Sequence, residues 1–124
     1  MNVVDSCGWL EYFADGENAS FFAPAIEDSA QLIVPSLCLF EVFKRILQQR
    51  TEQDALRAIA LMRQAKVVDL NDSLALSAAR LSANARLALA DSIILCTAQQ
   101  QGATLWTQDA HFEGMDGVRY VAKR

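Results

Sequence analysis

Apolar residues along this chain follow two patterns. Short apolar runs bounded by polar residues are typical of buried strands, and apolar positions that recur every three or four residues are typical of amphipathic helices. The runs predict strands at residues 2–4, 31–34, 67–70, 104–107 and 118–121. The helical spacing predicts helices at residues 6–14, 18–28, 36–49, 51–65, 72–85 and 89–101.

Individual residues support several of these boundaries. Pro35 pushes the residue before it toward extended geometry, which favours a strand up to Val34. Ser36 can cap the helix that follows, and Gly102 can end the helix before it. Pro24 lies inside the second predicted helix, where it either begins the regular part of the helix or kinks it.

The same spacing predicts which helix faces are buried. For the helix at 36–49, the inward face is predicted to consist of Leu37, Phe40, Phe43, Ile46 and Leu47. For the helix at 72–85, it is predicted to consist of Leu74, Leu76, Ala78 and Leu81. The aromatic residues Trp9, Tyr12 and Phe13 of the first helix are expected in the core, with a groove for a partner as the alternative.

The alternation of strands and helices predicts the fold class. Strands joined through helices pair in parallel, and the handedness of these connections places helices on both faces of the sheet. We therefore expect one α/β domain over residues 1–124, with three layers and a central, mostly parallel sheet of four to five short strands. In such sheets ligands bind beyond the carboxyl ends of the strands, where the strand order changes direction.

Composition narrows the possible classes of protein. Hydrophobic residues make up 52% and charged residues 21% of the 124 residues, which is typical of a packed globular protein. No apolar run approaches the roughly 18 residues that cross a bilayer, and Asp5 lies where a signal peptide would carry basic residues. A cytoplasmic location is expected. Cys7, Cys38 and Cys96 form no close pair and are expected to be small buried hydrophobes.

The net charge of −4 argues against a protein whose whole surface attracts nucleic acid. Any such binding must be local, for example near Lys44, Arg45 and Arg50. Each of these residues, taken alone, is also typical of a solvated helix face.

Four acidic residues lie where a ligand is expected. Asp5 and Asp109 follow predicted strands, while Glu41 and Asp91 lie within helices among apolar neighbours. Each alone has an ordinary explanation: a cap, a helix-dipole interaction or, for Glu41, an ion pair with Arg45. At one edge of a sheet, however, four carboxylates repel one another unless a cation compensates them. Oxygen ligands without histidine suit Mg²⁺ or Mn²⁺ better than zinc.

The segments around these acids resemble the four signature segments of PIN domains. They are Val3-Val4-Asp5-Ser6, the run from Pro35 to Val42, the run from Leu89 to Ile94, and the run from Leu105 to Phe112. The four segments occur in the same order as in PIN domains and extend over nearly the whole chain. Within this family the sequence is most similar to the VapC toxins, which are single PIN domains. Ser92 departs from the pattern, because many relatives have a small apolar residue after the third acid.

The resemblance implies a metal-dependent endoribonuclease that is the toxin of a toxin–antitoxin pair. It further implies a homodimer, inhibition by a cognate antitoxin, and RNA products with 5′-phosphate and 3′-hydroxyl ends. The implied catalytic and metal-binding acids are Asp5, Glu41, Asp91 and Asp109, with Ser6 and Thr107 as supporting hydroxyls. His111, the single histidine, is expected to be a surface or packing residue rather than a general base.

Two other functions fit parts of the pattern. A receiver-like signalling module also has acids at the carboxyl edge of a doubly wound sheet, but the chain has no paired acid at Asp5 and no lysine after the fourth strand. A PIN-like domain could also bind metal or a partner without cutting RNA.

Overall fold

The computed structural model describes all residues from 1 to 124. The strands are β1 (Asn2–Val4), β2 (Leu32–Pro35), β3 (Lys66–Val68), β4 (Thr104–Thr107) and β5 (Val118–Tyr120). The helices are α1 (Ser6–Phe13), α2 (Ala19–Ile26), α3 (Ser36–Gln49), α4 (Glu52–Met62), α5 (Asp72–Ala85) and α6 (Leu89–Gln100), with 3-10 turns η1 (Ser29–Gln31) and η2 (Ala110–Phe112). The types and order of the predicted strands and helices are confirmed, and their ends differ by at most three residues.

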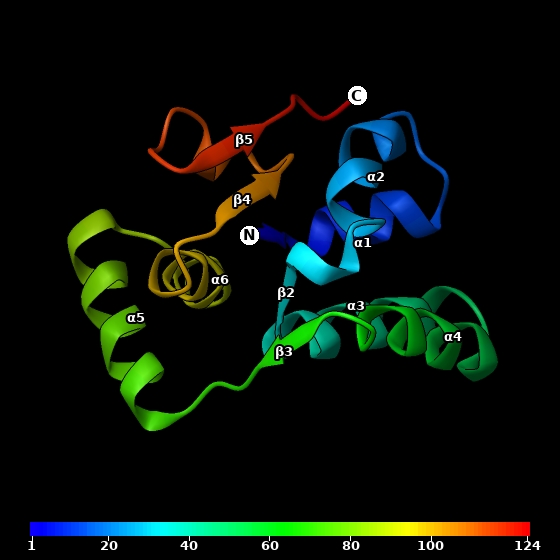
Figure 1. Ribbon diagram of the computed structural model, residues 1–124, viewed down its shortest axis with the longest axis horizontal. Coiled ribbons are helices and arrows are strands. Elements are labelled where there is room, and N and C mark those ends of the chain that lie inside the picture. The colour runs from blue at the N-terminus through cyan, green and yellow to red at the C-terminus, as the bar shows by residue number, and fades with distance from the viewer.

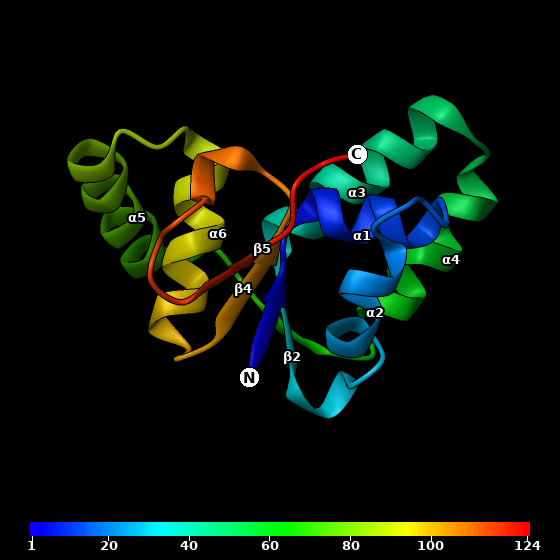
Figure 2. The same cartoon turned by 90° about the horizontal axis from the view of Figure 1, so that it is seen from above.

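The five strands form one parallel sheet in the order β3-β2-β1-β4-β5. Helices α5 and α6 cover one face of this sheet and α1 to α4 lie on the other (Figures 1 and 2), so the predicted three-layer α/β fold is confirmed. The chain moves outward from β1 to β3 and returns to add β4 on the other side of β1. This order differs from the 2-1-3-4-5 order of receiver-like sheets.

The central strands are the most buried part of the molecule. Val3, Ile33 and Leu105, on three adjacent strands, have no solvent-exposed surface. Trp9 and Phe112 pack into the same core from α1 and η2. Helices cover both faces of the sheet, so side chains on both sides of its central strands are buried. This explains why the sequence has short apolar runs at these strands and no alternation of apolar and polar residues.

The predicted inward face of α3 is partly wrong. Phe40 is 62% exposed, whereas Cys38, Val42 and Ile46, spaced four residues apart, are buried. The apolar stripe of α3 is wider than the surface that α1, α4 and the sheet cover, so part of it remains in solvent. Leu76 of α5, also predicted to be buried, is 66% exposed because α5 packs mainly against α6.

The residues that cap the helix N-termini agree with the sequence at α4 and differ from the prediction at α3. Thr51 caps α4 by accepting a hydrogen bond from the backbone N–H of Asp54 at 3.1 Å. Ser36 was expected to cap α3, but Pro35 takes the capping position, and the Ser36 hydroxyl accepts a hydrogen bond from the Leu70 N–H at 3.2 Å. Pro24 lies inside α2.

None of the single helices has the length and apolar composition needed to cross a membrane, although α5 and α6 taken together as a bent pair reach both criteria.

Candidate metal centre

The four predicted acids all lie at the carboxyl edge of the sheet or on helices that begin there. Asp5 directly follows β1, and its backbone N–H donates to the carbonyl oxygen of Trp106 at 2.9 Å, which extends the strand pairing to this residue. Asp109 follows β4 by two residues and caps η2. Glu41 lies in the second turn of α3, and Asp91 lies in the first turn of α6.

A buried threonine connects the two acids that follow strands. The Thr107 hydroxyl donates to Asp5 Oδ2 at 2.7 Å and accepts the backbone N–H of Asp109 at 2.9 Å. The other carboxylate oxygen of Asp5 accepts the backbone N–H of Ser6 at 2.7 Å. Because Thr107 has no exposed surface, both contacts are fixed in the interior. The contacts connect Thr107 to Asp5 and to the backbone of Asp109, and its supporting role stays a prediction.

A second hydroxyl connects Glu41 to the same cluster. Ser6 Oγ donates to Glu41 Oε1 at 2.7 Å, across 35 residues of sequence. The ion pair between Glu41 and Arg45 that the sequence allowed is absent from the structure. Glu41 is therefore oriented by a neutral donor, which leaves its negative charge uncompensated.

The other two acids meet at a histidine. The Nδ1 atom of His111 lies 3.2 Å from Asp91 Oδ2 and 3.2 Å from Asp109 Oδ1. The ligand atoms of these three residues all lie within 4.8 Å of one another, so they can share one cation. His111 is a surface residue, as expected, with 72% of its side chain exposed. Its contact with two acids is nevertheless a feature that the sequence analysis missed.

The electrostatics of the cluster follow from burial and like charges. Burial raises the pKa of Asp5 from 3.8 to about 6, against the hydrogen bonds from Thr107 and Cys7 that lower it, and the nearby charge of Asp91 adds to the rise. Burial raises the pKa of Asp91 as well, and the charge of Asp109 adds to it. The protein thus holds carboxylates close together at a cost in free energy.

Cys7 is a second contact of Asp5 that the sequence did not reveal. Its Sγ lies 3.4 Å from Asp5 Oδ2 and 3.6 Å from Thr107 Oγ1. Burial, followed by the charge of Asp5, raises the pKa of this thiol to about 12, so it stays protonated and can donate to the carboxylate. Cys38 and Cys96 are buried, as expected.

These residues fit a divalent cation. Neither Asp5 nor Glu41 forms an ion pair, and hydroxyl, thiol and backbone N–H donors orient them. A cation would compensate the negative charge of these carboxylates. The ligand atoms that lie within 4.8 Å of one another are those of Asp91, Asp109 and His111, and Asp5 and Glu41 are not part of this group. Carboxylate oxygens match the preference of Mg²⁺ and Mn²⁺, and His111 adds one nitrogen.

Comparison with known proteins relates this geometry to a family. The model of the PIN domain matches residues 3–118. Among solved structures, a toxin–antitoxin complex from Klebsiella pneumoniae contains a similar chain with 22% identity and a TM-score of 0.82, covering 96% of each chain. VapC20 from Mycobacterium tuberculosis, described as a toxin that cleaves the sarcin–ricin loop, has 13% identity and a TM-score of 0.78, covering 94% of this chain and 95% of that one.

A third structure, DNA-bound VapBC from Salmonella typhimurium, has 15% identity and a TM-score of 0.74, covering 98% of both chains. No curated protein matches the sequence. At these identities the solved structures establish a shared fold, and the match to the family model covers nearly the whole chain.

Proposed function

Because this chain belongs to the PIN-domain family of nucleases, we propose that it is a Mg²⁺- or Mn²⁺-dependent endoribonuclease that acts in the cytoplasm as the toxin of a toxin–antitoxin pair. The observation that carries the proposal is the hydrogen-bonded cluster at the carboxyl edge of the sheet. It links all four acids through Ser6, Thr107 and His111.

In this proposal, Asp5, Glu41, Asp91 and Asp109 hold the cation. When bound, the cation polarises the scissile phosphate and makes a nearby water more acidic. Thr107 fixes the carboxylate of Asp5, and Ser6 fixes that of Glu41, so that both oxygens remain oriented when no substrate is present. Outer contacts of this kind keep ligands in place and affect metal affinity strongly.

The reaction is the addition of water across a phosphodiester bond. The water oxygen forms a bond to phosphorus, and the bond from phosphorus to the 3′ oxygen breaks. One water proton goes to the departing 3′ oxygen and the other to solvent, which leaves a 5′-phosphate and a 3′-hydroxyl end. No side chain of this chain needs to form a covalent intermediate.

The proposed partners are RNA, a cognate antitoxin and a second copy of the chain. An antitoxin is supported by the similarity to chains from toxin–antitoxin complexes of Klebsiella pneumoniae and Salmonella typhimurium. A nucleic-acid substrate of the proposed kind is supported by the similarity to VapC20, a toxin that cleaves the sarcin–ricin loop. A homodimer is proposed by analogy with the family.

Cleavage of RNA by the purified protein tests the function. We expect cleavage with Mg²⁺ or Mn²⁺, none with EDTA, and loss of activity in Asp5→Asn, which removes one charge while keeping the shape. The matched control is Asp69→Asn, because Asp69 also follows a strand but is exposed and outside the cluster. Sequencing the RNA ends should show 5′-phosphates. Full activity of Asp5→Asn would reject the proposed site, and absence of metal-dependent cleavage would favour a PIN-like domain that only binds.

A further inference from the structure

A pair of buried amide side chains lies behind the turn from β4 to η2, which carries Asp109. The Nδ2 atom of Asn18 donates a hydrogen bond to Oε1 of Gln108 at 2.9 Å, across 90 residues of sequence. Asn18 is the residue before α2, and Gln108 lies between Thr107 and Asp109. Their exposed fractions are only 3% and 5%. Burying an amide costs free energy unless it is hydrogen-bonded, so the two side chains depend on each other.

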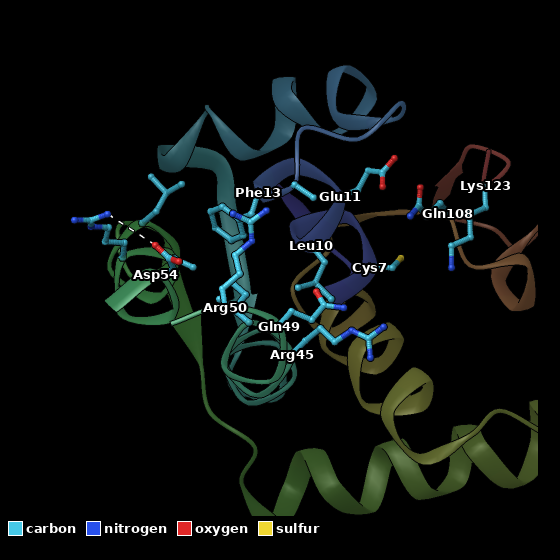
Figure 3. Close-up of a pocket in the computed structure, with 15 residues that line it drawn as sticks. Cys7, Leu10, Glu11, Phe13, Arg45, Gln49, Arg50, Asp54, Gln108 and Lys123 are labelled. Carbon is cyan, nitrogen blue, oxygen red and sulfur yellow. Dashed lines mark ion pairs between the residues drawn. The ribbon is translucent and has the colours of Figure 1, made fainter. Parts of the chain in front are cut away.

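The same asparagine contacts two further segments. Its Nδ2 atom also donates to the carbonyl oxygen of Ala122 at 3.0 Å, and its backbone N–H donates to Oε2 of Glu11 at 2.8 Å. Figure 3 shows the side chain of Gln108 between those of Glu11 and Lys123. Asn18 therefore joins α1, the turn from β4 to η2 and the C-terminal segment at one point.

The backbone hydrogen bonds of the sheet end before this turn. The last one between β4 and the C-terminal segment is donated by Val121 to the carbonyl oxygen of Thr107, at 3.1 Å. Beyond Thr107 the chain leaves the sheet, and Asp109, whose side chain is 29% exposed, lies in the turn. The hydrogen bond of Gln108 to Asn18 therefore ties a segment that the sheet no longer holds to the interior.

The turn carries contacts to two of the acids on either side of the amide. The residue before the amide is Thr107, whose hydroxyl donates to Asp5 and accepts the backbone N–H of Asp109. The residue after it is Asp109, which lies close to Asp91, and these like charges repel each other when no cation is bound. The repulsion favours an outward movement of Asp109. An anchor at Gln108 opposes that movement, and an uncharged amide does so without cancelling the charge of the acids.

We propose that Asn18 and Gln108 are positioning residues of the nuclease, and that their hydrogen bond holds the turn in the orientation in which Asp109 binds the cation. The inference rests on the proposed function, because it takes Asp109 as a metal ligand. A contact that orients a metal ligand without touching the metal changes metal affinity or activity by about 10- to 100-fold. Both amides act in this indirect way, through the backbone of the turn.

The competing explanation is that the amide pair serves only the stability of the fold. Two apolar side chains of the same shape can stabilise a buried position about as well, because a hydrogen-bonded pair gives up its bonds to water. Directional hydrogen bonds, in contrast, select one arrangement of the segments that they join. The pair lies at the residue between Thr107 and Asp109, where one arrangement matters for the acids, and this favours the positioning role.

The affinity for Mg²⁺ and the kinetics of RNA cleavage test the inference in two variants. Gln108→Met removes the acceptor and leaves the bond from Asn18 to Ala122 in place, and Asn18→Leu removes the donor with little change in size. Met62→Ala is the control, because Met62 is a fully buried residue of α4 outside the cluster, so this variant loses stability without a change at the turn. Calorimetric titration gives the Mg²⁺ affinity, and steady-state cleavage gives kcat and KM. Circular dichroism establishes that each protein is folded at the temperature used.

We expect both variants to bind Mg²⁺ about tenfold more weakly and to lower kcat at saturating Mg²⁺ about tenfold, with a change in KM of less than about threefold. The double variant should lose no more than the weaker-binding single variant, because the two substitutions remove one and the same bond. Met62→Ala should unfold at a lower urea concentration but keep the Mg²⁺ affinity and kcat of the unmodified protein.

A folded Gln108→Met protein whose Mg²⁺ affinity and kcat stay within about twofold of the unmodified protein would overturn the inference. An equal loss of Mg²⁺ affinity in Met62→Ala would also overturn it, because the effect would then follow stability alone. If one amide variant fails to fold, the other decides, because each removes the same bond. The unmodified protein tests the proposed function separately. If it binds Mg²⁺ but cleaves no RNA, the nuclease proposal fails, and the Mg²⁺ affinities of the variants still decide the positioning role. If it binds no Mg²⁺, both proposals fail.

Discussion

The stability of Asp5→Asn in the absence of metal is the most direct test of how the acidic cluster is built. Burial raises the pKa of Asp5 to about 6, so between about pH 4 and pH 6 the folded chain binds this proton more tightly than the unfolded chain does. The free energy of unfolding therefore falls as pH rises through this window, and the whole penalty is present above pH 6. An asparagine of the same shape avoids this penalty.

The magnitude follows from the size of the shift. The rise of the Asp5 pKa from 3.8 to about 6 corresponds to about 3 kcal/mol in the free energy of unfolding. The asparagine loses the hydrogen bond that the carboxylate accepts from Thr107, at a cost of about 1 kcal/mol. At pH 8 in EDTA the variant should therefore be more stable by about 2 kcal/mol, which is a rise in Tm of about 8 °C for a domain of this size. At pH 4 it should be less stable, because only the lost hydrogen bond remains.

Urea denaturation of both proteins at pH 4 and pH 8, with EDTA and then with Mg²⁺, provides the measurement. A ligand that binds only the folded state raises stability, so Mg²⁺ should stabilise the unmodified protein and have little effect on the variant. Asp69→Asn, outside the cluster, should change the free energy of unfolding by no more than about 0.5 kcal/mol, both with EDTA and with Mg²⁺. Equal destabilisation of Asp5→Asn at both pH values would refute the reasoning, because the buried charge would then carry no penalty.

Five further substitutions test other parts of the structure. Thr107→Val removes the hydroxyl between Asp5 and the Asp109 backbone; denaturation should show a loss of about 1–3 kcal/mol, and Thr107→Ser should recover most of it. His111→Ala should change the affinity for Mg²⁺ by no more than a factor of a few but weaken the affinity for Zn²⁺, because imidazole is a better ligand for Zn²⁺ than for Mg²⁺. Calorimetric titration measures the two affinities, and an equal loss of both would contradict this role of His111. Phe40→Ser should change the unfolding free energy by less than about 0.5 kcal/mol, whereas Val42→Ala should cost at least about 1 kcal/mol; the reverse order would contradict the observed face of α3.

The sequence predicted the positions of the four acids because their local contexts are distinctive. Asp5 and Asp109 follow short runs that are typical of buried strands, and parallel strands bring their carboxyl ends to one edge. Glu41 and Asp91 were recognisable as acids among apolar neighbours, where a solvated ion pair contributes too little to explain them. The order of strands and helices predicted that the four carboxylates lie near one edge of the sheet. Of the four, only Asp91 and Asp109 have ligand atoms within 4.8 Å of each other in a group that also includes His111, and a shared metal site of all four stays a prediction.

The contacts between elements could not be predicted in the same way. Phe40 and Val42 are both apolar residues of α3, and only the placement of α1 and α4 decides which of them is covered. His111 reaches Asp91 across 20 residues because the turn η2 directs its ring toward α6, and no local pattern encodes that direction. Cys7 looked like a small apolar residue until its thiol was found against Asp5.

The placement of positive charge explains why the centre can accept a cation from outside. Arg45 lies one helical turn from Glu41, where an ion pair would be easy to form, yet the carboxylate takes its hydrogen bond from Ser6 instead. Asp5 likewise interacts with a hydroxyl, a thiol and a backbone N–H. Neutral donors orient carboxylates without cancelling their charge, whereas an arginine paired with Glu41 would cancel it. Because Arg45 forms no ion pair with Glu41, the negative charge of the cluster stays available to a divalent ion.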